Sequence, residues 1–190
     1  CEEVMAEGID SGLPLVRSAV LQSMTHLKSD LARAVDSNKL SFLVSKVCHF
    51  AGEISGSSIG TRSSACRALG ALLSLEPVLS LFDSFEHGLV TLISLGSADS
   101  GTLQVSLAWS LANVCDVLRE QTQSGKRLPA ALAKCVAKHL PSISALTIRL
   151  AGCNDKIRCN AVRCIGYIFD LFSALGADME EDFESKAVDC

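Results

Sequence analysis

The chain has 190 residues, of which 48% are hydrophobic, 20% are charged and 5% are aromatic, and its formal net charge at pH 7 is −4. Its acids gather in residues 1–10 and 176–190, whereas residues 11–175 are mildly basic. That basic excess is too weak for a nucleic-acid-binding surface, and no apolar run reaches the roughly 18 residues that a membrane helix needs. We therefore expect neither a nucleic-acid partner nor membrane insertion.

One twelve-residue pattern occurs four times and organises the chain. Its clearest copy begins at residue 61, and the other copies begin at residues 16, 103 and 157. Each copy starts with an aliphatic residue or Thr, continues with Arg or Gln, and then places small and apolar residues at helical spacing. The copies are 45, 42 and 54 residues apart, which is the period of repeats built from paired helices that share one core.

The four copies predict four similar helices, called B helices, each paired with a preceding A helix where the chain provides one. We expect the B helices near residues 13–28, 61–75, 102–121 and 155–175, in one repeat array over residues 1–175. Residues 176–190 are expected to form an acidic connection toward a further repeat of a longer chain. Unpaired ends of such an array expose apolar helix faces, so we also expect self-association.

Three segments resemble repeats of the HEAT and armadillo superfamily: residues 62–70, 108–113 and 155–166. Their order extends the resemblance over about residues 60–170. The resemblance implies an all-α, right-handed α-solenoid of about three and a half repeats, without catalytic residues or cofactor. It also implies that the residue at pattern position 2 bonds carbonyls or acids at the turn within each repeat. That residue is Arg17, Arg62, Gln104 or Arg158 in the successive copies, and Asp99 and Asp155 are the candidate acids.

A second, mostly polar stripe runs along the B helices at pattern positions 4, 7, 11 and 14. It carries the only Trp and the only Tyr of the chain. In solenoids of this kind the B helices line the concave surface, and Trp, Tyr and Arg are the residue types that most often anchor partners. We predict a protein-binding site made of Arg67, Trp109, Asn113, Asn160, Arg163 and Tyr167.

Position 7 of three successive copies gives a basic–aromatic–basic row, Arg67, Trp109 and Arg163. Such a row suits an extended acidic or phosphorylated segment of a partner, because Arg makes bidentate contacts with carboxylate and phosphate. The chain's own acidic residues 178–184 are a candidate competitor. The opposing interpretation is structural: Trp109 fills the gap between repeats, and each Arg pairs with a nearby acid.

Trp109 and Asn113 also resemble the peptide-binding pair of nuclear-import armadillo adaptors. That resemblance implies an Asn that bonds the backbone of an extended peptide and a Trp that flanks a Lys pocket. The alternative function is therefore a transport adaptor. The corresponding pairs in the other copies are Gln22 with His26, Arg67 with Ala71, and Arg163 with Tyr167, so the pair is not repeated.

The nine cysteines contain no CxxC spacing, and most lie in predicted helices. We expect all nine to be free thiols in a reducing compartment, the cytoplasm or the nucleus, and we expect no metal site. Cys153, Cys159 and Cys164 form the densest cluster, but their spacing does not place them on one helix face. The best enzymatic candidate is Cys135 with His139, yet the sequence shows no third orienting group. We therefore predict a non-enzymatic interaction scaffold.

Overall fold

The computed structural model describes the backbone of residues 7–53, 57–98, 100–123 and 128–188, with side chains through Gly176. These ranges contain helices, turns and bends, and none of them contains a strand. The chain is an all-α solenoid, as the sequence predicts. Within the described ranges no helix combines the length and the apolar character that a bilayer crossing requires.

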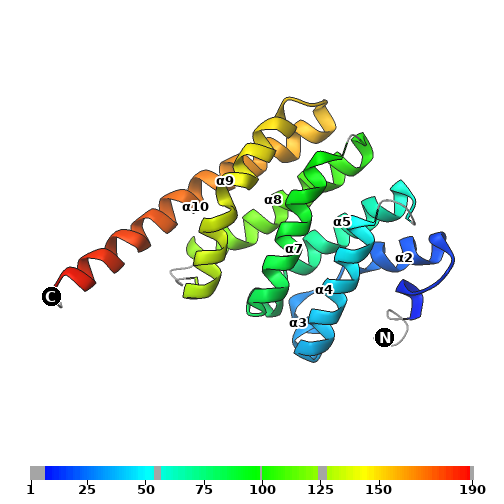
Figure 1. The fold of residues 1–190 in the computed structure, drawn as a ribbon, viewed down its shortest axis with the longest axis horizontal. Coiled ribbons are helices and arrows are strands. Elements are labelled where there is room, and N and C mark those ends of the chain that lie inside the picture. The colour runs from blue at the N-terminus through cyan, green and yellow to red at the C-terminus, as the bar shows by residue number, and fades with distance from the viewer. Residues whose placement is uncertain (1–6, 54–56, 99, 124–127, 189–190) are drawn as a thin grey trace.

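The long helices lie in two layers (Figure 1). The B layer consists of α2 (Pro14–Met24), α5 (Ile59–Leu73), α8 (Gly101–Gln123) and α10 (Asp155–Val188). The A layer consists of α4 (Ser37–Gly52), α7 (Phe82–Ser94) and α9 (Ala130–Ala151). Short helical segments complete the connections: α3 (Ser29–Arg33), α6 (Glu76–Leu79) and the 3-10 helix η1 (Leu95–Ser97). Consecutive helices of each layer pack against one another, and each A helix packs on its own B helix.

The residue at pattern position 2 fastens each B helix to the turn before it. In all four copies its side chain donates to a backbone carbonyl: Arg17 to Ile9, Arg62 to Ala51, Gln104 to Ala98 and Arg158 to Ala151. The carbonyls at a helix end lack partners within the helix, and a cation there also complements the helix dipole. The structural role expected for this position is confirmed. Arg158 also pairs with Asp155 at 2.9 Å, whereas Asp99 lies outside the described residues.

Small residues allow the B helices to touch directly. A Cβ added at Gly70 of α5 would lie 2.4 Å from Ser110 Cβ of α8. The Oγ atoms of Ser63 and Ser106 are 2.6 Å apart, and the Ser110 hydroxyl donates to the Cys66 carbonyl at 2.9 Å. Larger side chains at these positions would hold the two helices farther apart. The inward positions of the pattern form the core between the layers. In the second copy all of them are buried: Thr61, Ala65, Ala68, Leu69 and Leu72.

The backbone of the acidic residues after 175 is helical. Residues 176–188 continue α10 without interruption, and their role as a connection toward a further repeat stays a prediction. Figure 1 shows this end of α10, in red, leading away from α2 and α5. The acidic residues 178–184 are therefore carried away from the row that they were expected to compete for.

Candidate protein-binding face

The position-7 row lies on one face of the B layer, where three neighbouring helices present it. The Arg67 guanidinium of α5 stacks over the Trp109 indole of α8, with its Cζ atom 5.5 Å from the ring centroid. Arg163 of α10 donates from Nη2 to Oδ1 of Asn113, one turn beyond Trp109, at 3.0 Å. Four of the six predicted site residues are thus joined in two contacts that bridge successive repeats.

Trp109 sits where two hollows of this face meet. The central hollow, of about 970 Å³, is bordered by α2, α5, α8 and the start of α10 and includes Gln22, His26, Arg67 and Lys156 in its lining. The side hollow, of about 430 Å³, reaches from Trp109 and Asn113 toward α3 and α6. Trp109 itself is partly buried. It packs between repeats and still borders both hollows.

The charge of this face is unbalanced. The central hollow has two cationic side chains, Arg67 and Lys156, and its described lining residues include no carboxylate. In the part of the chain that the structure describes, neither Arg67 nor Arg163 forms an ion pair; their partners are an indole ring and an amide oxygen. Local pairing of these arginines with acids, the structural alternative, is therefore not observed.

The remaining predicted residues lie on the same helices. Tyr167 of α10 is covered by Arg119 of α8, whose Cζ is 4.8 Å from the ring centroid. Arg119 is held there by Asp116, 2.7 Å away. Asn160 is partly buried one turn before Arg163, and among the described residues its amide has no hydrogen-bond partner. The face is thus cationic around Trp109 and charge-balanced around Tyr167.

Sequence reasoning missed Arg119 and Lys156. Arg119 follows Asp116 by three residues, so continuing the stripe one step beyond position 14 reaches it. Lys156 precedes the fourth copy, and no pattern marks it. It borders the central hollow because the start of α10 lies beside the start of α8, and Lys156, Gly101 and Thr102 all line that hollow.

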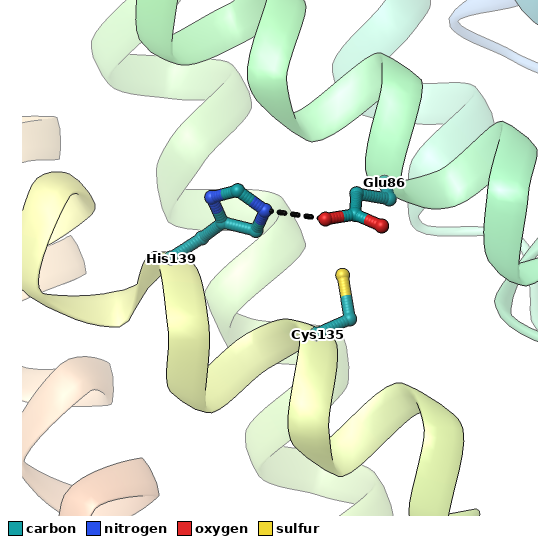
Figure 2. A group of neighbouring side chains, drawn as sticks. All are labelled: Glu86, Cys135 and His139. Atoms are coloured by element: carbon teal, nitrogen blue, oxygen red, sulfur yellow. Dashed lines mark hydrogen bonds and ion pairs between the residues drawn. The ribbon is translucent and has the colours of Figure 1, made fainter.

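The Cys135 and His139 pair does have a third group. Glu86 of α7 accepts a hydrogen bond from His139 Nε2 at 2.9 Å, and the Cys135 thiol points toward the same carboxylate (Figure 2). The sequence does not reveal this group because it comes from another A helix, 49 residues before Cys135. Burial raises the pKa of the Cys135 thiol to about 11, and the Glu86 carboxylate adds to that effect. A thiol with this pKa is a poor nucleophile at neutral pH.

The described cysteines are all free thiols: Cys48, Cys66, Cys115, Cys135, Cys153, Cys159 and Cys164. Cys164 and Cys115 approach each other across α8 and α10, with their sulfur atoms 3.7 Å apart. Cys1 and Cys190 lie outside the described residues, so for these two cysteines the free thiol stays a prediction.

No protein-family model matches the chain, and no curated protein matches its sequence. Among solved structures, the chain is similar to an engineered protein at 13% identity and a TM-score of 0.45, covering 95% of this chain and 87% of that one. It is also similar to a designed armadillo repeat protein at 10% identity and a TM-score of 0.43, covering 88% of this chain and 99% of that one. These likenesses are too distant to carry an argument, so the solenoid assignment rests on the helices and contacts described above.

Proposed function

We propose that the chain is a non-enzymatic protein-interaction scaffold that binds an extended acidic segment of a partner protein across the B layer. The observation that carries the proposal is the Arg67–Trp109 stack at the edge of a cationic hollow of about 970 Å³. The acidic segment would lie across α5, α8 and α10. Its carboxylates would meet Arg67 and Lys156 in the central hollow, and it would continue over Trp109 toward Arg163.

The chemistry of the row supports an anionic partner. Both guanidiniums keep donor groups that no carboxylate of the described residues engages, and a carboxylate or phosphate can take two of them at once. Trp and Arg side chains near the centre of a patch are the usual anchors of a protein interface. Here Trp109 is partly buried, and Arg67 and Arg163 are exposed. The amide of Asn160 and the amide nitrogen of Asn113, whose Oδ1 accepts from Arg163, can bond a peptide backbone.

The transport-adaptor alternative has weaker support. Its basic cargo would enter a hollow that already holds Arg67 and Lys156, and like charges repel. In addition, Oδ1 of Asn113 already accepts from Arg163. The Trp109–Asn113 pair nevertheless suits an extended peptide. We keep the extended binding mode of the adaptors but assign an acidic peptide in place of a basic one.

The finer family assignment also belongs to this proposal. We infer a resemblance of the three segments at residues 62–70, 108–113 and 155–166 to repeats of HEAT repeat-containing protein 6. We infer that the chain is a HEAT-type array without enzymatic activity that works in the cytoplasm or nucleus, and that further repeats of the same chain cover its apolar ends.

The experiment uses Trp109, the only Trp of the chain, as the reporter. Oligo-glutamate, a phosphoserine peptide, oligo-glutamine and oligo-lysine are titrated separately while the indole emission is recorded. The anionic peptides should shift or quench the emission with saturation, and added salt should weaken the effect. The glutamine peptide should not.

Two outcomes would contradict the proposal. One is an emission that the anionic peptides leave unchanged. The other is an equal response to oligo-lysine, which would show that the face does not select charge. A stronger response to oligo-lysine than to oligo-glutamate would favour the basic-cargo adaptor instead.

A further inference from the structure

A second polar cluster lies in the A layer, away from the binding face. Cys135 and His139 are one turn apart on α9, and Glu86 faces them from α7 (Figure 2). One ligand atom of each residue, the sulfur, an imidazole nitrogen and a carboxylate oxygen, lies within 4.8 Å of the other two. Three donors of different chemistry therefore converge between two helices that are distant in sequence.

This donor set is one that zinc accepts. Cys sulfur, His nitrogen and Glu oxygen are all zinc ligands, and three protein ligands with a fourth position open to water form a common tetrahedral site. Ideal zinc bond lengths separate such ligand atoms by roughly 3.3–3.7 Å. His139 Nε2 and Glu86 Oε1, at 2.9 Å, are slightly closer than that. Side-chain rotations that move the ligand atoms by about 1 Å are enough to match it.

The Glu86 carboxylate is placed to meet a cation between the two helices. It already accepts hydrogen bonds from Lys138 Nζ and from His139 Nε2, at 2.7 and 2.9 Å. A divalent ion at this point would stabilise the Cys135 thiolate and the Glu86 carboxylate together.

We propose that Glu86, Cys135 and His139 form a Zn²⁺ site that fastens α7 to α9. On binding, the Cys135 thiol releases its proton to solvent. The His139 proton moves from Nε2 to Nδ1 by exchange with solvent, so that the freed Nε2 lone pair binds the ion in place of the hydrogen bond to Glu86. Lys138 must also give way, since its Nζ is 2.7 Å from the same Glu86 oxygen. Its side chain is 66% exposed and can swing into solvent. The site connects consecutive repeats from the layer opposite the binding face.

The test is Co²⁺ titration of the reduced 190-residue chain, followed by displacement with Zn²⁺. One Co²⁺ per chain should produce a thiolate-to-cobalt charge-transfer band in the near ultraviolet and visible bands of tetrahedral intensity. Cys135→Ser should abolish the charge-transfer band. Glu86→Gln and His139→Ala should weaken binding at least about tenfold. The matched control is Cys159→Ser, which removes an exposed thiol of α10 and should change nothing.

A variant at the competing cation sharpens the test. Lys138→Met removes a positive charge beside the carboxylate, so it should tighten Co²⁺ binding by about fivefold, the effect in water of one unit charge on a divalent ion about 8 Å away. If the His139–Glu86 hydrogen bond had only a structural role, Lys138→Met would not increase the affinity for Co²⁺.

The proposal is overturned if the charge-transfer band is absent at equimolar Co²⁺, or if it survives Cys135→Ser. If circular dichroism shows that a variant has unfolded, alkylation of the unsubstituted chain decides. Zn²⁺ should slow the modification of Cys135 and leave that of Cys159 unchanged, and equal rates with and without Zn²⁺ would reject the site.

Discussion

The Arg67 guanidinium covers the indole ring of Trp109, with its Cζ atom 5.5 Å from the ring centroid. The two side chains belong to α5 and α8, so the contact joins two successive repeats. The stack lies at the edge of the central hollow, so the contact that joins the two repeats also leaves the Arg67 cation at that hollow.

The stack should be measurable as a coupling energy. Arg67→Ala, Trp109→Leu and the double variant should give an interaction energy of about 0.5–1 kcal/mol, the usual value for a partly exposed cation–π contact. Urea denaturation followed by circular dichroism measures it without relying on the lost indole. Lys134→Ala combined with Trp109→Leu is the control cycle and should show no coupling. Zero coupling in the Arg67 cycle would mean that the stack is not maintained in solution.

The close approach of α5 and α8 predicts that a single methyl group is costly at Gly70. Gly70→Ala places a Cβ 2.4 Å from Ser110 Cβ, and the resulting overpacking should lower the free energy of unfolding by about 1–3 kcal/mol. Gly166→Ala in α10 is the matched control, because a Cβ there meets nothing within 4 Å. That variant should instead gain up to about 1 kcal/mol from helix propensity. Equal effects of the two substitutions would contradict the direct packing of the B helices.

The position-2 contact predicts an asymmetry between two substitutions of Arg62. Arg62→Ala loses the hydrogen bond from Nε to the Ala51 carbonyl, 3.2 Å long, and should cost about 1–2 kcal/mol of unfolding free energy. Arg62→Gln should recover at least half of that loss, because Gln104 makes the equivalent bond to Ala98 in the third copy. Chemical denaturation of both variants checks this. If Gln is as damaging as Ala, the carbonyl contact is not the source of the effect.

Much of this architecture follows from local rules. The inward positions are buried because helical spacing places them on one face. The position-2 residues reach the turn carbonyls because each pattern copy begins at a helix start. The position-7 row was likewise predictable, since equivalent positions of successive repeats stack by construction.

Contacts between residues outside the pattern were not predictable. Glu86 meets Cys135 and His139 only because α7 and α9 pack with a particular rotation about their axes, and the A helices share no repeated motif that fixes it. Arg119 over Tyr167 depends on the length of α8 beyond its pattern. The continuation of α10 past residue 175 goes against the local charge, because acids near a helix C-terminus oppose the helix dipole.

The outer side of α10 predicts concentration-dependent self-association. Val162, Phe169 and Phe172 are 55%, 69% and 47% exposed, and their spacing places them along one side of the helix. Light scattering over a range of concentrations should show a growing mass, and Phe169→Ser with Phe172→Ser should suppress it. Phe42→Ser, which removes a Phe that is 50% exposed on α4, is the control. A chain that stays monomeric, or a double variant that associates as before, would refute the role of α10.

The central claim, that the position-7 row binds an extended acidic segment, is tested most directly by single charge reversals. Fluorescence anisotropy of a labelled oligo-glutamate peptide is measured against Arg67→Glu, Arg163→Glu and the matched reversal Lys134→Glu on α9, with circular dichroism to confirm helicity. Each reversal in the row should weaken binding by about tenfold or more, a loss of about 1.4 kcal/mol, while Lys134→Glu stays within about twofold. Equal losses in all three variants, or undiminished binding when Arg67 and Arg163 are reversed, would contradict the account.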